Sequence, residues 1–200
     1  MINYRTLVIV DMVYIGSYQV SVKTQEVNRQ TAMLTAATAD DMPADWTFKW
    51  TELWQKTDFD CQKIVKLIYE EQIWGLVRYI LYPYPGSPKF LEIEHLETNP
   101  TNRGQKNERL IEPVGKWLIW YALQVGLRYC SEDVSERLIE LVSLEEAFTY
   151  YRDIIQMQYL APTTIAPGED GYVFEFSRTQ ARAFCLRQES EWGVPTLFDS

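Results

Sequence analysis

The stretch from residue 90 to residue 123 constrains the fold of this chain more than any other part of the sequence. Its alternating apolar residues predict a strand, a polar loop follows, and the last part predicts an amphipathic helix. We expect this helix over residues 111–127, because its apolar residues recur at helical spacing and Gly126 is a natural C-terminal stop. A strand followed by a long amphipathic helix indicates a sheet with a helix packed against it.

The strand predicted over residues 90–98 does not keep strict alternation. Two residues, Glu94 and His95, separate the apolar residues Ile93 and Leu96, which would therefore fall on opposite faces of a regular strand. A β-bulge at Glu94–His95 would keep both apolar residues on one face. Because a bulge bends a strand away from its neighbour and frees backbone polar groups, we expect a slot in the sheet that can accept an extended ligand.

The remaining elements follow from the same periodicity arguments. Strands are predicted over residues 4–14, 18–23, 61–69, 73–82, 136–143 and 172–176. Helices are predicted over residues 25–39, 45–56, 144–157 and 177–191, the last with Ser177 as its N-cap. Residues 161–171 are expected to form a loop, and the chain from Gly193 is expected to form a frayed tail.

These elements predict an α/β (α+β) fold with a mixed, mostly antiparallel central sheet flanked by helices. The strands at residues 61–69, 73–82 and 90–98 are joined by short connections, which are typical of an antiparallel meander. We expect one domain over residues 1–200, with a recognisable core at about residues 60–160 and a C-terminal strand–helix extension over residues 172–192.

Composition excludes several classes of function. A formal net charge of −9 argues against nucleic acid as a partner, because nonspecific nucleic-acid binding needs a basic face. No apolar run approaches the length of about 20 residues that spans a membrane, so no membrane association is expected. A single histidine and three widely spaced cysteines argue against a metal site and against a disulfide framework, so we expect a cytoplasmic protein.

The loop after the strand at residues 90–98 leads into the start of the predicted helix. Free amide groups at a helix N-terminus bind phosphate well, and Arg103 and Lys116 could add positive charge there. The segment Leu96-Glu97-Thr98-Asn99-Pro100-Thr101-Asn102-Arg103-Gly104 resembles the L-x-V-x-P-x-x-R-G phrase of the GNAT superfamily of acyl-CoA-dependent N-acyltransferases. The segments Val114-Gly115-Lys116-Trp117-Leu118 and Ala147-Phe148-Thr149-Tyr150-Tyr151 are similar to two further phrases of that superfamily.

The resemblance covers about residues 60–160 and implies transfer of an acyl group from acetyl-CoA or another acyl-CoA to an amine. The amine could belong to a small molecule or a peptide. The resemblance also implies residues that bind the co-substrate: Leu96, Thr98, Arg103, Gly104, Val114, Gly115 and Lys116. In the superfamily a tyrosine faces the sulfur of acyl-CoA, and Tyr151 matches that position.

The reaction itself needs a base for the ammonium group and an acid for the leaving thiolate. Glu94 at the expected bulge is our candidate base, His95 could share that role, and Tyr151 is the candidate acid. Tryptophans at residues 46, 50 and 54 share one face of the helix predicted there. That face either packs into the core or forms an aromatic wall of the acceptor pocket.

The sequence also departs from the superfamily pattern. Residues 105–113 intervene between the Arg-Gly pair and the helix, and Pro113 stands where the superfamily has its first glycine. Proline has no N–H group and cannot donate a hydrogen bond to a phosphate. The alternative prediction is therefore a catalytically inactive GNAT-fold module that binds or assembles with partners. The sequence leaves the oligomeric state open, and a homodimer is compatible with it.

Overall fold

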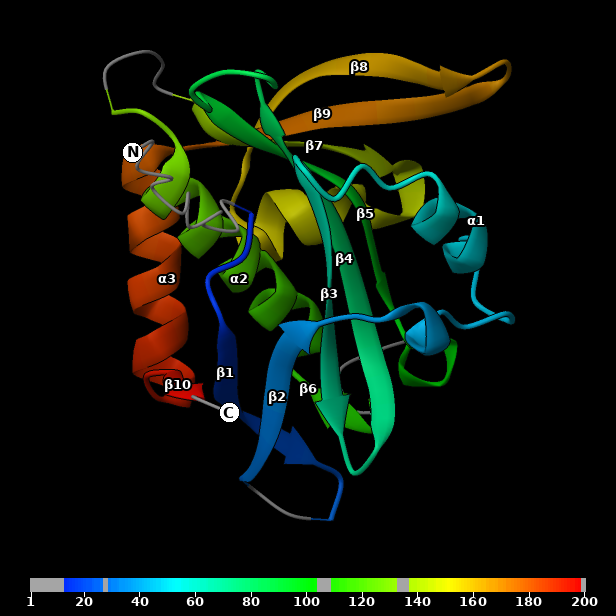
Figure 1. Cartoon of the computed structure of the whole chain (residues 1–200), viewed down its shortest axis with the longest axis vertical. Helices are drawn as coiled ribbons and strands as arrows, with labels where there is room; N and C mark the ends of the chain where they lie inside the picture. Colours follow the sequence, from blue (N-terminus) through cyan, green and yellow to red (C-terminus); the bar gives the residue numbers. More distant parts are fainter. Residues whose placement is uncertain (1–12, 27–28, 104–108, 133–136, 199–200) are drawn as a thin grey trace, which may run out of the picture.

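A computed structural model describes residues 13–26, 29–103, 109–132 and 137–198 of the chain. These residues form a ten-stranded sheet in the order β10-β1-β2-β3-β4-β5-β7-β9-β8, and β6 pairs with β1 beside this path (Figure 1). The strands are β1 (Ser17–Thr24), β2 (Gln30–Ala36), β3 (Gln62–Tyr69), β4 (Gln72–Tyr82), β5 (Phe90–Thr98), β6 (Ile111–Glu112), β7 (Arg137–Leu144), β8 (Gln158–Ala166), β9 (Glu169–Ser177) and β10 (Thr196–Phe198). The α-helices are α1 (Trp50–Gln55), α2 (Val114–Tyr129) and α3 (Arg178–Trp192).

The sheet is mostly antiparallel. Strands β2, β3, β4 and β5 pair with one another in an antiparallel meander, as the sequence predicts. Strand β7 then lies parallel to β5, because helix α2 returns the chain to the same end of the sheet before β7 begins. The predicted fold class, a mixed and mostly antiparallel sheet flanked by helices, is therefore confirmed.

The two faces of the sheet carry different layers. On one face, α2 and α3 lie side by side (Figure 1), and α2 buries Trp117, Leu118 and Tyr121 in the main core. On the other face, the short helix α1 covers a second, smaller core around Trp50 and Leu76. Of the tryptophans predicted to share one helix face, Trp50 is fully buried, so at this residue the face packs into the core.

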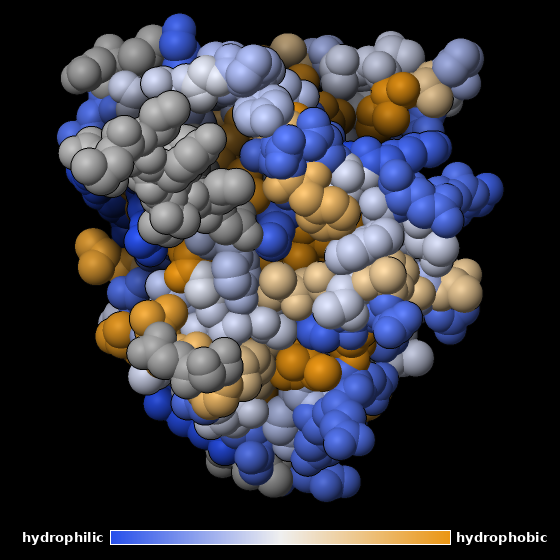
Figure 2. Space-filling view, in the orientation of Figure 1, coloured by the Kyte–Doolittle hydropathy of each residue, from blue (hydrophilic) through white to orange (hydrophobic). Residues whose placement is uncertain are grey.

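The outer surface is mixed. The face drawn in Figure 2 shows hydrophilic residues interrupted by several separate hydrophobic patches. Such scattered apolar surface is normal for a folded chain. None of the helices formed by the described residues is long and apolar enough to cross a membrane.

The prediction of a helix over residues 25–39 is wrong. Residues 30–36 form strand β2, which pairs with both β1 and β3. Ala32 and Leu34 are buried while residues between them are more exposed, which is the period of a strand. Pairing with two neighbouring strands outweighs the helix propensity of this segment.

The loop predicted over residues 161–171 and the frayed tail from Gly193 are also wrong. Strands β8 and β9 form a hairpin that projects from the body of the molecule (Figure 1), with Gly168 at a φ of 82° in its turn. Pro162 is tolerated because β8 is the last strand of the sheet and has a partner on one side only. The tail returns as β10, which pairs with β1.

Several helix boundaries differ from the prediction. The helix expected over residues 45–56 is reduced to α1, and the one expected at residue 111 begins at Val114 after the short strand β6. The helix expected over residues 144–157 is replaced by a 3₁₀ turn at Glu145–Ala147 and a π-helix at Tyr150–Ile155. Most of the strand predicted over residues 4–14 lies outside the described residues.

Candidate functional site

Strand β5 contains the predicted bulge. In its pairing with β4, Tyr79 lies opposite Ile93 and Arg78 lies opposite His95, so Glu94 is the extra residue. The prediction of a bulge at Glu94–His95 is therefore confirmed. The bulge also keeps Ile93 and Leu96 on one face of the sheet, as expected, because both pack against the main core on the side of α2.

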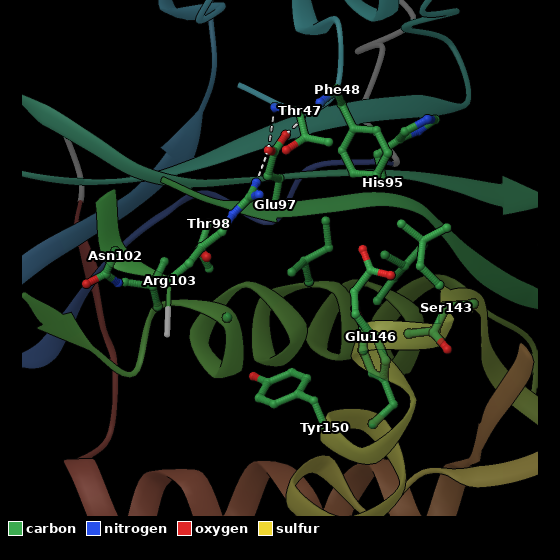
Figure 3. A pocket seen from close by; sticks show the side chains of 18 of the residues that line it. Thr47, Phe48, His95, Glu97, Thr98, Asn102, Arg103, Ser143, Glu146 and Tyr150 are labelled. Atoms are coloured by element: carbon green, nitrogen blue, oxygen red, sulfur yellow. Dashed lines mark hydrogen bonds and ion pairs between the residues drawn. The ribbon is translucent and has the colours of Figure 1, made fainter. Parts of the chain in front are cut away.

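The bulge marks the point where the sheet opens. The parallel pairing of β5 with β7 ends at Ile93 and Leu141. Beyond it lies a cavity of about 370 Å³, a volume within the range of small-molecule sites. Its walls come from residues 93–98 of β5, residues 141–144 of β7, the start of α2 and the segment that follows β7 (Figure 3). The predicted slot in the sheet is thus present.

Glu94 lines this cavity and is held by two neighbours on the α1 side of the sheet. The amide Nε2 of Gln62 donates to both carboxylate oxygens, at 3.0 and 2.9 Å, and Nε of Arg78 lies 3.3 Å from Oε2. Burial raises the pKa of Glu94, while the charge of Arg78 and the hydrogen bond from Gln62 oppose that rise. A carboxylate with a raised pKa is suited to accept a proton near neutral pH.

His95 lies next to Glu94, against an aromatic wall. Its ring contacts Phe48 edge to face at 5.0 Å between centroids, and Trp50 lies at 6.3 Å. Burial lowers the pKa of His95 to about 4, and the charge of Arg78 acts in the same direction. The imidazole is therefore neutral at pH 7.

A buried carboxylate that sequence reasoning missed, Glu97, organises the upper wall of the cavity in Figure 3. Its side chain is 3% exposed and accepts hydrogen bonds from the backbone N–H groups of Thr47 and Phe48, at 2.8 and 3.1 Å. It also accepts from Nε1 of Trp50 at 2.9 Å and pairs with Arg103. These contacts join strand β5 to the segment before α1. Thr47 and Glu97 are separated by 50 residues along the chain, so no local sequence pattern could reveal their contact.

The cationic residues are arranged differently from the prediction. Arg103 lines the cavity, but its guanidinium is already paired with Glu97. Lys116 is not among the residues that line the cavity, and its Nζ lies 3.9 Å from Glu191 of α3. Arg109, which we did not predict, lines the cavity instead. Gly104 lies outside the described residues.

The start of α2 forms the other end of the cavity. Val114 and Gly115 line it, and the N-cap residue Pro113 makes no side-chain capping bond. Asn102 fixes the approach to this helix, because its amide donates to the carbonyl oxygen of Ile111 at 2.8 Å and accepts from the N–H of Ile111 at 2.9 Å. The first turn of α2 therefore presents backbone N–H groups that no side chain of the cap satisfies.

Two consecutive tyrosines, Tyr150 and Tyr151, line the lower wall from the π-helix. Tyr151 is 7% exposed and its ring packs near Phe174 in the main core. The hydroxyl of Tyr150 lies beside Gly115, where a Cβ atom would come within 2.9 Å of it. Burial raises the pKa of both phenols, so both are protonated at neutral pH and can donate a hydrogen bond.

The structure thus gathers most of the predicted site residues around one cavity. They are Glu94, Leu96, Thr98, Arg103, Val114, Gly115 and Tyr151. The bulged strand β5, the end of its pairing with β7 and the start of α2 beside the gap define an α/β protein with a cavity between two strands of its sheet.

Comparisons with known proteins identify the fold. No protein-family model matches the sequence, and no curated protein shows significant similarity to it. Solved structures do match. A GNAT-family acetyltransferase from Bacillus cereus is 14% identical with a TM-score of 0.50, over 74% of this chain and 99% of that one. An uncharacterized protein from Bacillus halodurans is 13% identical with a TM-score of 0.58, over 88% and 97%.

A third match comes from a plant protein. Arabidopsis thaliana Naa50, in complex with the bisubstrate analogue CoA-Ac-MVNAL, is 12% identical with a TM-score of 0.52, over 73% of this chain and 98% of that one. At these identities the likeness concerns the fold. The described chain has the GNAT fold, and the resemblance seen in the sequence is confirmed at that level.

Proposed function

We propose that this chain is an N-acyltransferase that moves an acetyl or other acyl group from acyl-CoA to an amine. The observation that carries this proposal is the cavity of about 370 Å³ between β5 and β7, which begins at the bulge and reaches the start of α2. An extended ligand with an anionic end and a reactive end matches these two ends. The CoA-containing analogue bound to Naa50 supports the choice of ligand.

The co-substrate would lie along β5. Its phosphates would meet the free N–H groups of Val114, Gly115 and Lys116 in the first turn of α2. Arg103 and Arg109 would supply positive charge at that end. Backbone groups of Leu96 and Thr98, on the side of β5 that has lost its pairing with β7, would hydrogen-bond the pantetheine chain.

The chemistry would take place at the bulge. Glu94 would remove a proton from the acceptor ammonium, directly or through water, and the neutral amine would attack the thioester carbonyl carbon. A C–N bond forms, the tetrahedral intermediate collapses, and the C–S bond breaks. Tyr151, protonated at neutral pH, would give its proton to the leaving thiolate. Glu94 keeps the first proton of the ammonium group. The nitrogen loses a second proton as the amide forms, and this proton returns through water to the Tyr151 phenolate, so charge and protons balance.

The acceptor would approach from the α1 side of the sheet. Phe48 and His95 form an aromatic wall beside Glu94 on that side, and the neutral imidazole does not repel an ammonium group. Both a small-molecule amine and the amine of a peptide are compatible with this opening.

A second candidate is an inactive binding or assembly module with the same fold. It is favoured by the position of Lys116, which pairs with Glu191 outside the cavity, and by Arg103, whose charge is engaged by Glu97. Glu112 also lines the cavity near the start of α2, where a carboxylate would repel a phosphate.

Ligand binding separates the two candidates. We expect acetyl-CoA and CoA, added at millimolar concentration, to raise the thermal unfolding midpoint, since a ligand that binds only the folded state stabilises it by mass action. Adenosine diphosphate and an unrelated thioester without the nucleotide serve as control ligands. If acetyl-CoA leaves the midpoint unchanged, the acyltransferase proposal is overturned. If it binds but no thiol is released with a panel of amines and peptides, the inactive module is favoured.

A further inference from the structure

One polar group in the cavity wall has no role in the mechanism above. The hydroxyl of Ser143, on β7, is buried and has no hydrogen-bond partner among the described residues. The residue is 3% exposed and lines the cavity. Leaving a buried hydroxyl unpaired costs about 1–3 kcal/mol, so native proteins rarely keep one without a purpose.

The position of Ser143 in the fold indicates which part of a ligand it meets. Its side chain is on the same face of β7 as Leu141, because burial alternates with the exposed Val142 between them. Leu141 is the last β7 residue that pairs with β5, opposite Ile93, and the bulge residue Glu94 follows directly. Ser143 therefore lies just past the point where the strands part, at the level of the bulge.

The two ends of the cavity are lined by different kinds of residue. The end proposed for the phosphates is formed by Arg103 and the start of α2, whereas Ser143 lies at the opposite end of the view in Figure 3. The neighbours of Ser143 in the wall are Leu141, Leu144, Ala147 and Tyr151, together with Glu146, which Figure 3 shows beside it. A carboxylate such as Glu146 only accepts hydrogen bonds when ionised, whereas the hydroxyl of Ser143 can donate one to an acceptor group of a ligand.

We propose that the hydroxyl of Ser143 donates a hydrogen bond to the carbonyl oxygen of the acyl thioester. This inference rests on the proposed function, since it takes acyl-CoA as the occupant of the cavity. In an acyl-CoA the thioester carbonyl is the hydrogen-bond acceptor nearest to the reacting end. A donor from β7 would hold this carbonyl from the strand opposite β5, and would distinguish acyl-CoA from the product CoA, which has a thiol in its place.

The variant Ser143→Ala removes the hydroxyl and changes little else. We expect it to raise the Kd for acetyl-CoA about threefold to tenfold, the usual worth of one neutral hydrogen bond, and to leave the Kd for CoA unchanged. Because the hydroxyl has no partner among the described residues, the midpoint of the ligand-free variant should equal or exceed that of the wild type. Isothermal titration calorimetry with each ligand and a thermal unfolding curve provide the three readouts.

A matched control is Ser17→Ala, far from the cavity. The hydroxyl of Ser17 lies 2.7 Å from Oγ1 of Thr35 and 2.9 Å from the hydroxyl of Tyr14, so this variant should lower the unfolding midpoint and preserve both affinities. The two serines are thus expected to show opposite patterns, one in binding and the other in stability.

Each other result contradicts the inference in a distinguishable way. If the wild type binds acetyl-CoA and Ser143→Ala binds it equally well, this inference is overturned and the proposed function stands. If both ligands weaken equally, the hydroxyl contacts a part that they share, and its assignment to the carbonyl is wrong. If the ligand-free midpoint drops as in Ser17→Ala, the hydroxyl has a structural partner such as an ordered water. If the wild type binds neither ligand, both proposals fail.

Discussion

The carboxylate of Glu97 accepts a hydrogen bond from the indole N–H of Trp50, with 2.9 Å between Oε2 and Nε1. Trp50 is fully buried at the start of α1, so the bond ties β5 to the smaller core on the opposite side from α2. The same carboxylate accepts from the backbone N–H of Phe48, whose ring forms the wall next to His95. One buried charge therefore sets the position of the proposed acceptor wall.

We predict that Glu97→Ala lowers the free energy of unfolding by about 3 kcal/mol. The partner Arg103 is 45% exposed and stays solvated without Glu97, so the cost comes mainly from buried donors left unpaired, at about 1–3 kcal/mol for each that water does not reach. Loss of the carboxylate also leaves the N–H groups of Thr47, Phe48 and Trp50 without their acceptor. Guanidinium-induced unfolding followed by tryptophan fluorescence measures the change.

The control for this prediction is Glu52→Ala. Glu52 forms exposed pairs with Lys49 and Lys56, at 3.5 and 3.9 Å, and such pairs contribute about 0–1 kcal/mol. A loss below about 1 kcal/mol in Glu97→Ala would mean that water replaces the network at little cost, and would remove Glu97 from the account of the wall.

We predict that Tyr151→Phe lowers kcat at least about 100-fold with any acceptor that supports turnover, because it removes the proton donor for the thiolate. Tyr150→Phe is the matched comparison, since its hydroxyl lies near Gly115, at the phosphate end of the cavity. That variant should mainly weaken binding of acetyl-CoA. The reverse pattern, with kcat lost in Tyr150→Phe and retained in Tyr151→Phe, would transfer the role to Tyr150.

The alternation of side chains between the two faces of a strand allowed the central part of the site to be predicted. The spacing of Ile93 and Leu96 requires a bulge if both are to reach the same core, and this requirement comes from packing rather than from any distant contact. The opening between β5 and β7 follows from the same bulge. The closing helix α3 was predictable for a similar local reason, as Ser177 caps it by accepting from the N–H of Gln180 at 3.2 Å.

Features that depend on distant contacts could not be predicted in this way. Strand β2 is selected by its two partners, and its own residues favour a helix about as well. In the sequence Glu97 is one of several polar residues of a strand. Its role depends on α1, which places Trp50 within hydrogen-bond distance of it. The position of Lys116 depends on α3, because the pairing with Glu191 decides which way its side chain extends.

We predict that the acidic limb of the pH–rate profile belongs to Glu94. Burial raises its pKa, so the carboxylate needed as base forms only above that raised value, and kcat/KM should rise with pH through it. Glu94→Gln should lower kcat/KM at least about 100-fold and abolish this limb. Circular dichroism checks that the variant folds, because Arg78 loses an ion-pair partner.

His95 offers a test of this assignment. Its pKa is lowered to about 4, so a limb that persists near pH 4 in Glu94→Gln would identify the imidazole as the base. Glu92→Gln is the matched carboxylate control, as Glu92 lies near Glu94 but does not line the cavity. It should retain the limb.

Glu92 carries a further prediction, about stability. Burial raises its pKa, and the charges of Glu94 and Glu140 add to the rise, while Arg137 opposes it. Because its pKa in the folded state lies above the unfolded value, stability that is present at low pH is lost as the pH rises through the folded pKa. Glu92→Gln removes this loss, so it should raise the unfolding midpoint at pH 7, and the gain should disappear as the pH falls toward about 4, near the unperturbed pKa of glutamate. Glu145→Gln, an exposed position, should change the midpoint at neither pH. A gain that is equal at both pH values would show that Glu92 affects stability through packing and not through its charge.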